Sequence, residues 1–352
     1  RQVETPRLLQ HDVRDPIVEP APQVPKPPMT LDPIAPVDDV SARPLELRVE
    51  SPDLLGRRLA AAHLERGDEV RLLSRSGKDG QVEDGRWFQG DLSADGDFRA
   101  FVDGVDVLYH CAGELRDESR MQSLHVDGTR RLIAAASGSI GRWVQLSSVG
   151  VYGACGAVCV TEDTPLNPAN HYEKTKADSD RLVLAAAASH AFPLVVLRPS
   201  IVFGPGMPNR SLHQLASMIR RKLFFFIGPP GASANYIPVE NLIDALIACG
   251  EHSSAPGNIY NLSGWTTMEK FIGTLAEILR VPAPIVRVPL LPAATLANLV
   301  KNIPFSPIYP SRVLALSSRT RFSDEKIRCD LRFKHKFSIE EALIKMFDES
   351  SF

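Results

Sequence analysis

The chain has 352 residues, of which 44% are hydrophobic, so it can bury a large core in one or two domains. Its formal net charge of -2 at pH 7 provides no basic field that would by itself attract nucleic acid or an anionic membrane, and we expect a small-molecule partner. Five scattered cysteines without zinc-site spacing, and no apolar run of the roughly 20 residues that a membrane helix needs, favour a cytoplasmic protein without a metal centre or membrane span.

The first part of the chain differs in composition from the rest. Residues 1–44 contain ten of the 28 prolines and show no hydrophobic period, which predicts a disordered leader. After it, short β-branched runs alternate with helical patterns, as in parallel β-α-β construction. We predict strands at 45–49, 69–75, 86–92, 106–113, 143–149 and 193–203, and helices that begin near Leu54, Met121, Tyr172 and Ser211.

This order of elements predicts an α/β fold with a Rossmann-type, doubly wound parallel sheet, whose ligand lies at the carboxyl ends of the strands. Residues 45–202 would form the dinucleotide-binding core. Residues 203–352, in which Gly/Pro-rich loops alternate with short helices, would form mostly a smaller substrate-binding cap that is interleaved with the core.

The clearest chemical signal is "HYEKTK", in which Tyr172 and Lys176 are four residues apart at the start of a predicted helix and share one face. A free tyrosine is a poor base because its pKa is about 10, and a nearby ammonium would lower that pKa. Ser148, at the end of a predicted strand in "LSSVGVYG", could hold a substrate oxygen against the phenol. Together they suit proton transfer in alcohol and ketone chemistry. The alternative is an exposed helical pair worth a few tenths of a kcal/mol.

Several ordered motifs make the chain resemble the extended short-chain dehydrogenases/reductases, in the NAD-dependent epimerase/dehydratase family, over roughly residues 45–346. The motifs are "GRRLAAAHLERGDEVRLLSR", "GDL", "VDVLYHCAG", "HVDGTRRLIAAA", "LSSVGVYG", "YEKTK", "LRPSIVFGPG" and "NYIPVENLIDALI".

The resemblance implies a Rossmann fold, a nicotinamide cofactor and a homodimer. It also implies that Ser148, Tyr172 and Lys176 are the catalytic residues and that Lys176 holds the nicotinamide ribose. The remaining cofactor residues that it implies are Asp91 and Leu92 beside the adenine, Cys111, Ala112 and Gly113 along the cofactor, and Pro199 against the nicotinamide.

The end of the second predicted strand bears on the choice between NADP and NAD. An acidic residue there would bind the adenosine ribose of NAD, whereas Arg75 could pair with the extra phosphate of NADP. We therefore expect NADP or NAD, with NADP favoured. The alternative is a solvated surface arginine.

The phosphate-binding turn departs from the family pattern. If the last of its three glycines is Gly56, Glu50 and Asp53 occupy the other two positions. Their Cβ atoms would crowd a pyrophosphate, and their carboxylates would repel it. Two interpretations stay open: a non-catalytic Rossmann-fold binding protein with a defunct loop, or residues 1–53 that do not represent the functional protein.

Two other positions bear on the substrate. His125 occupies the place of an asparagine that organises the active-site helix in the family, and Ile201 replaces an asparagine that is frequent in sugar-nucleotide epimerases. We expect an NAD(P)-dependent oxidoreductase or epimerase that acts on a hydroxyl or ketone of a nucleotide-sugar or a similar small molecule. A reductase of an apolar, steroid-like alcohol or ketone is the alternative.

Overall fold

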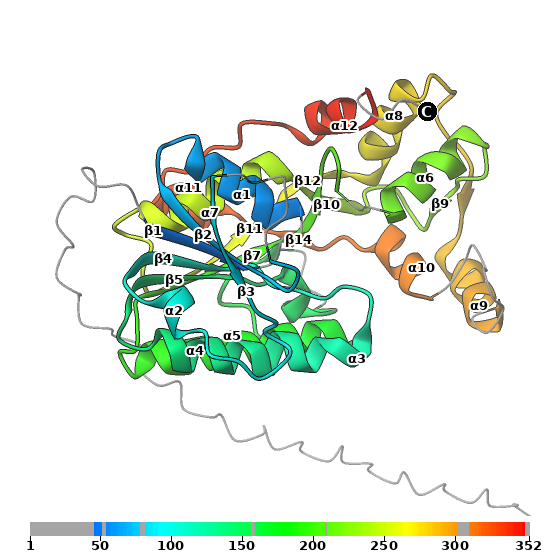
Figure 1. Cartoon of the computed structure of the whole chain (residues 1–352). Coiled ribbons are helices and arrows are strands. Elements are labelled where there is room, and N and C mark those ends of the chain that lie inside the picture. Colours follow the sequence, from blue (N-terminus) through cyan, green and yellow to red (C-terminus); the bar gives the residue numbers. More distant parts are fainter. Residues whose placement is uncertain are drawn as a thin grey trace, which may run out of the picture. The chain divides into compact units, whose positions relative to one another are not determined.

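The protein is built around a seven-stranded sheet in which every neighbouring pair of strands is parallel (Figure 1). The computed structural model describes residues 46–50, 54–77, 82, 84–155, 159–207, 210–300 and 310–348. The strands, in their order across the sheet, are β11 (Asn258–Leu262), β7 (Leu194–Pro199), β5 (Ile140–Leu146), β4 (Val105–His110), β1 (Glu46–Glu50), β2 (Glu69–Ser74) and β3 (Arg86–Gln89).

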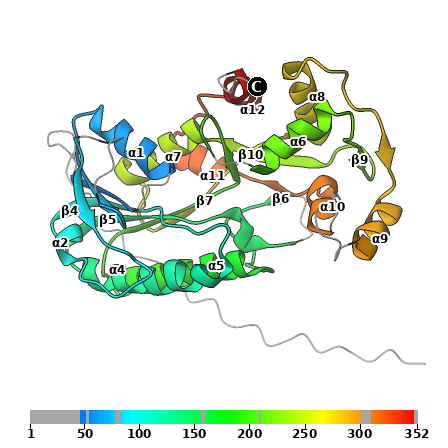
Figure 2. The same ribbon diagram turned by 45° about the vertical axis from the view of Figure 1, so that its right-hand side comes forward.

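Helices cover both faces of this sheet (Figures 1 and 2). One face carries α1 (Leu54–Leu64), α7 (Val239–Glu251) and α11 (Glu325–Asp330), which pack on an aliphatic core that includes Leu59, Leu242 and Ile327. The other face carries α2 (Arg99–Val102), α4 (Thr129–Ala136) and α5 (His171–Ala188). Its core includes Leu132, Trp143 and Val183. Parallel strands covered on both sides are expected to be apolar throughout, and all six residues of β7 are buried.

The smaller region is built from short strands and helices that follow β7 in the chain. A three-stranded sheet contains β12 (Gly264–Thr267), β10 (Ser233–Pro238) and β8 (Ile201–Phe203). A second core, which includes Leu212, Phe271 and Leu343, joins three helices to this sheet. These helices are α6 (Arg210–Arg220), α8 (Met268–Ile278) and α12 (Ile339–Asp348).

Two pairs of short parallel strands and two further helices complete this smaller region, which we call the cap. β9 (Phe226–Ile227) pairs with β13 (Arg287–Val288), and β6 (Cys159–Val160) pairs with β14 (Arg321–Phe322). The helices are α9 (Leu290–Val300) and α10 (Pro310–Ser317). Among the described residues, every helix is too short or too polar to cross a membrane.

The predicted strand at 193–203 was wrong as a single element. It is divided at Ser200 into β7, which belongs to the seven-stranded sheet, and β8, which belongs to the three-stranded sheet. One continuous apolar run thus supplies strands to two sheets. At the break, Ser200 donates its backbone N–H to the carbonyl of Leu262, at the end of β11. The predicted leader at 1–44 lies outside the described residues.

Candidate active site

The residues predicted for cofactor binding and catalysis lie at the carboxyl ends of the parallel strands. The order of the strands reverses at β1, which has β2 on one side and β4 on the other, and such a switch point opens a crevice for a ligand. Arg75 follows β2, Asp91 and Leu92 follow β3, Cys111, Ala112 and Gly113 follow β4, Ser148 follows β5, and Pro199 ends β7.

A capping box fixes the start of α5 and therefore the place of Tyr172. The side chain of Asn170 accepts a hydrogen bond from the backbone N–H of Glu173 at 2.9 Å, and the Glu173 carboxylate accepts from the N–H of Asn170 at 3.4 Å. The helix then places Tyr172 and Lys176 one turn apart on one face. The predicted pair is thus held by local hydrogen bonds at the edge of the sheet.

Ser148 is positioned by the turn that follows β5. Its hydroxyl accepts a hydrogen bond from the N–H of Gly150 at 3.1 Å and caps the 3₁₀ turn Val149–Tyr152. A Cβ on Gly150 would lie 3.2 Å from the Cγ of Glu173, so a glycine lets this turn approach the first turn of α5. The turn also brings the Ser148 hydroxyl near the Tyr172 phenol, and this hydroxyl acts to lower the pKa of the phenol.

The expected lowering of the Tyr172 pKa is wrong for this structure. Burial raises the pKa of Tyr172 to about 12, and the nearby Ser148 hydroxyl offsets only part of this. The Lys176 ammonium donates a hydrogen bond to the Leu146 carbonyl at 2.6 Å. An ammonium held by that carbonyl tethers α5 to the end of β5, while the low-polarity surroundings keep the phenol protonated.

His125 occupies the centre of a second set of contacts beside Tyr172. Its Nε2 accepts a hydrogen bond from the backbone N–H of Glu114 at 2.8 Å, so the proton of the neutral ring is on Nδ1, which lies 2.8 Å from the Thr175 hydroxyl. The His125 ring lies edge-on to Tyr172, with centroids 5.8 Å apart. Burial is the main reason why the pKa of His125 is lowered to about 3, and the Lys176 charge adds to it.

The segment around His125 is a π-helical turn, Gln122–Gly128, between α3 (Glu118–Met121) and α4. A Cβ on Gly128 would lie 2.9 Å from the carbonyl oxygen of Leu92, so this glycine allows the helix to pack directly on the segment after β3. His125 therefore links the loop after β4, this irregular helix and the first turn of α5.

A buried ion pair below the site was not anticipated from the sequence. The Oδ2 atom of Asp180, one turn after Lys176, accepts hydrogen bonds from Ser147 Oγ at 2.8 Å and from Arg198 Nε at 3.2 Å and Nη2 at 3.1 Å. The side chains of Asp180 and Arg198 are 0% and 2% exposed. Arg198 also donates to the Tyr152 hydroxyl at 3.0 Å. The signal in the sequence was a charged residue in the apolar strand "PLVVLRP" and a carboxylate four residues after Lys176.

Arg75 and Asp91 follow the neighbouring parallel strands β2 and β3. Arg75 is exposed, and its positive charge helps to lower the pKa of Asp91. Burial raises that pKa, but hydrogen bonds from the N–H and hydroxyl of Ser93, at 2.9 and 2.6 Å, outweigh burial. Leu92 is buried, and its carbonyl accepts a hydrogen bond from Arg131 at 3.1 Å.

The other predicted cofactor residues differ in accessibility. Cys111, Ala112 and Pro199 are buried, whereas Gly113 is exposed at the end of the β4 segment. Gly56 is buried in α1, as a close contact between helix and sheet requires. Residues 51–53 of the predicted phosphate turn, including Asp53, lie outside the described residues.

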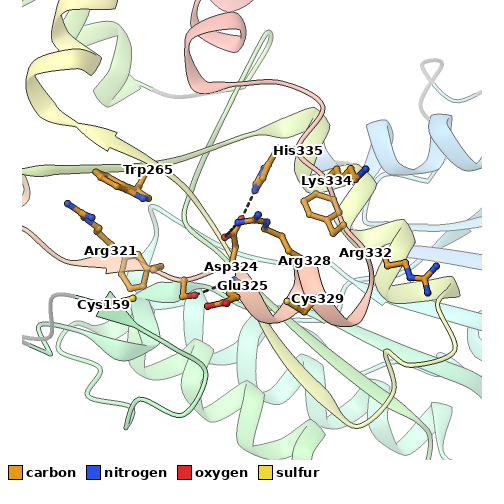
Figure 3. Close-up of a pocket in the computed structure, with 13 residues that line it drawn as sticks. Cys159, Trp265, Arg321, Asp324, Glu325, Arg328, Cys329, Arg332, Lys334 and His335 are labelled. Atoms are coloured by element: carbon orange, nitrogen blue, oxygen red, sulfur yellow. Dashed lines mark hydrogen bonds and ion pairs between the residues drawn. The ribbon is translucent and has the colours of Figure 1, made fainter.

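Two other features lie away from this edge. His63, Asp68 and Glu251 have potential metal-ligand atoms within 4.8 Å of one another, but Arg66 lies 2.6 Å from Glu251, and its charge disfavours a cation there. A pocket of about 930 Å³ contains Trp265, with Arg321 stacked on its ring at 3.5 Å (Figure 3). None of the predicted catalytic or cofactor residues lines it.

The strand order and the location of the site define a Rossmann-type α/β protein whose ligand crevice lies at the carboxyl edge of a doubly wound sheet. The chain belongs to the NAD dependent epimerase/dehydratase family, whose model matches residues 54–263. The family resemblance and the Rossmann fold are thus confirmed, and a nicotinamide cofactor is the one that the family uses.

The curated relatives include proteins named as hydroxysteroid dehydrogenases and proteins named for nucleotide-sugars. The chain is 24% identical over 312 residues to 3beta-hydroxysteroid-dehydrogenase/decarboxylase isoform 1 of Arabidopsis thaliana, covering 81% of this chain and 70% of that protein. It is 26% identical over 320 residues to a 3 beta-hydroxysteroid dehydrogenase/Delta 5-->4-isomerase of Mycobacterium tuberculosis, covering 82% of this chain and 85% of that protein. It is 26% identical over 195 residues to the UDP-glucose 4-epimerase of Vibrio cholerae, covering 51% of this chain and 59% of that protein.

Solved structures share the fold. A UDP-glucuronic acid 4-epimerase from Bacillus cereus, in complex with NAD, superimposes with a TM-score of 0.67 at 17% identity, over 86% of this chain and 96% of that one. An epimerase-like protein from Burkholderia cenocepacia gives a TM-score of 0.69 at 20% identity, over 87% and 97%. At these identities the similarity establishes the architecture.

Proposed function

We propose that the protein is an NAD(P)-dependent oxidoreductase or epimerase that acts at a hydroxyl or ketone carbon of a small molecule. The observation that carries the proposal is the closeness of the Ser148 hydroxyl to Tyr172 at the start of a capped helix, with Lys176 one turn further along the same face. All three lie at the sheet edge where a dinucleotide binds in Rossmann folds.

Except for Glu50, which ends β1 where the family has a glycine, the described residues suit a nicotinamide dinucleotide. A cation and a carboxylate, Arg75 and Asp91, follow the ends of adjacent strands, and the first turn of α1 carries no acidic residue. Lys176 would hold the nicotinamide ribose, and Pro199 would lie against the ring. The bound cofactor supplies or accepts the hydride.

The side chains have separate roles in this proposal. Tyr172 moves the proton of the substrate hydroxyl, and Ser148 orients the same oxygen through its own hydroxyl. Because burial raises the pKa of Tyr172 to about 12, the phenol is protonated at neutral pH and is ready to donate to a ketone oxygen. In the reverse direction the phenol has to release its proton before it can act as a base, and its raised pKa disfavours this step.

Two substrate classes are supported by different observations. Relatives named as a UDP-glucose 4-epimerase and a dTDP-glucose 4,6-dehydratase favour a nucleotide-sugar. Relatives named as 3beta-hydroxysteroid dehydrogenases cover more of this chain and favour an apolar alcohol or ketone. Ile201 and Leu115, in segments that follow strands β7 and β4, are 53% and 70% exposed and also favour an apolar substrate. A homodimer and a cytoplasmic location stay predictions.

Replacing Tyr172 with Phe tests the catalytic assignment. We expect turnover of a suitable alcohol or ketone to fall by at least about a hundredfold with little change in cofactor affinity, because only the proton-transferring hydroxyl is lost. Tyr236→Phe removes the same hydroxyl from the cap and is the matched control. Unchanged turnover in the Tyr172 variant would remove the assignment.

Titration of the full chain with NADPH and NADH, followed by cofactor fluorescence, separates the enzyme from a non-catalytic scaffold. Binding supports the enzyme, and absence of binding of either nucleotide supports the scaffold. If Arg75 pairs with the extra phosphate, Arg75→Gln weakens NADPH binding by about tenfold and leaves NADH binding nearly unchanged. Equal effects on both nucleotides would show that Arg75 does not contact that phosphate.

A further inference from the structure

Helix α9 presents an apolar side to solvent. Ala293 and Ala297, one turn apart, are buried against Ile227 and Val313. On the opposite side of the helix, Leu291 and Leu299 are 81% and 76% exposed. The sequence "LLPAATLANLV" has no charged residue. A helix on the surface of a globular protein normally turns polar or charged residues outward, so this arrangement calls for a partner.

The apolar surface continues onto the neighbouring segments. β9 and β13 pair just before α9, where the N–H of Phe226 donates to the carbonyl of Val286 at 2.9 Å. α10 lies beside α9 (Figures 1 and 2). Of the twelve large hydrophobic side chains that are exposed among the described residues, eight lie in these segments or within three residues of them. We define them as the cap face: Leu223, Ile285, Val286, Leu290, Leu291, Leu296, Leu299 and Leu314.

The segments that carry the cap face also lack acidic residues. Residues 278–323 contain no Asp or Glu and six Lys or Arg, and residues 199–239 contain no Asp or Glu and four Lys or Arg, in a chain whose net charge is -2. Arg220, Arg221 and Lys222 are exposed and directly precede Leu223. Such a charge asymmetry gives this part of the protein a positive field.

We infer that the cap face is a docking surface for an anionic lipid bilayer. Aliphatic side chains on a short helix, with exposed cations at the rim and no acidic residue in the segments themselves, suit the boundary between headgroups and acyl chains. Glu269 of α8 pairs with Arg287 of β13 at 2.7 Å, so the cations available to lipid are those of the turn after α6. The leucines of α9 would enter that boundary, and the cations of the turn after α6 would pair with lipid phosphates. A nucleic acid is disfavoured as the partner. Proteins that bind single-stranded nucleic acid combine cations with aromatic rings that stack on the bases, whereas the cap face is aliphatic.

Vesicle flotation with the full chain tests this inference. The protein should bind vesicles of phosphatidylcholine and phosphatidylglycerol, bind pure phosphatidylcholine at least about tenfold more weakly, and be released by high salt. The double variant Leu291→Ser/Leu299→Ser should lower the affinity by at least about tenfold, because it removes two side chains that enter the bilayer. The variant Arg221→Gln/Lys222→Gln should reduce the salt dependence.

The matched control is Ile344→Ser, which removes an exposed aliphatic side chain of α12 outside the cap face and should leave binding unchanged. All substituted residues are exposed, and circular dichroism with thermal melting checks that each variant is folded. The inference is overturned by absence of binding to mixed vesicles, by equal binding to pure phosphatidylcholine, or by full binding of the double leucine variant. It is also overturned if the wild type is a dimer that the double leucine variant dissociates, since a second copy would then cover the face.

Discussion

At the scale of single residues, the site is decided by what each polar side chain finds in the folded protein. His125 shows this clearly. In the sequence, His125 stands where the family has an asparagine. In the structure, its ring accepts a hydrogen bond from the backbone N–H of Glu114 and lies within hydrogen-bond distance of the Thr175 hydroxyl. A neutral imidazole can do both, because one nitrogen accepts while the other donates. The exchange therefore supplies a clamp beside Tyr172 that stays uncharged.

This clamp should make stability sensitive to acid. The pKa of His125 is about 3 in the folded protein and about 6.5 in an unfolded chain, so its contribution is present above pH 6.5 and is lost as the pH falls toward 3. Between pH 7 and pH 5 we expect the free energy of unfolding to fall by about 2 kcal/mol on account of this group. Denaturant titrations at several pH values measure it.

His125→Asn should be less stable at pH 7 but should show a shallower loss with falling pH. His190→Asn is the control, because His190 is exposed and asparagine tolerates its φ of 58°. If the His125 variant and the wild type have the same pH slope, the clamp is not neutral in the folded state.

At the scale of elements, α5 combines local and long-range constraints. Its start is fixed by the capping box of Asn170 and Glu173, which can be read from the sequence. Its rotation is fixed by Lys176, which bonds to the end of β5, and by Asp180, which bonds to Arg198 of β7. Removing one partner of such a buried ion pair typically costs about 3–5 kcal/mol, so the helix cannot turn without a large loss of stability.

The cap of α5 gives a second prediction. Asn170→Ala removes the acceptor of the Glu173 N–H and should lower the free energy of unfolding by about 1 kcal/mol. Hydrogen exchange should become faster in the first turn, which holds Tyr172. Asn170→Asp replaces the amide oxygen with a carboxylate oxygen that can accept the same hydrogen bond, so it should preserve both the stability and the slow exchange. A fully stable alanine variant would show that tertiary contacts alone hold this turn.

At the scale of the whole molecule, all five tyrosines among the described residues have phenols whose pKa is raised by burial. Burial raises the pKa values of Tyr109, Tyr152 and Tyr260, and raises those of Tyr172 and Tyr236 to about 12. An unfolded chain releases phenolic protons near pH 10. Folding therefore gains stability from these groups below pH 10, and the gain disappears as the pH rises toward 12.

We accordingly expect cooperative alkaline unfolding. The melting temperature should be steady near pH 8 and should fall steeply above about pH 10. The free energy of unfolding should fall there by more than the 1.36 kcal/mol per pH unit that one group supplies. The ultraviolet absorbance of phenolate should rise together with the loss of helical circular dichroism. Formation of more than one phenolate near pH 10 in fully folded protein would contradict the burial of these five side chains, since the sixth tyrosine, Tyr309, lies outside the described residues.

The sequence by itself determined the fold class and the family, and it predicted the chemical character of the site. The alternation of β-branched and helical runs, and the four-residue spacing of Tyr172 and Lys176, are patterns within short stretches of sequence. Both can therefore be read from the chain alone. The tertiary structure alone decided the division of the strand at Ser200, the partners of His125, the buried pair of Asp180 and Arg198, and the high pKa of Tyr172. These depend on contacts between residues far apart in the chain and on burial, because a pattern in the sequence specifies which face of an element is apolar but not which group will lie against it.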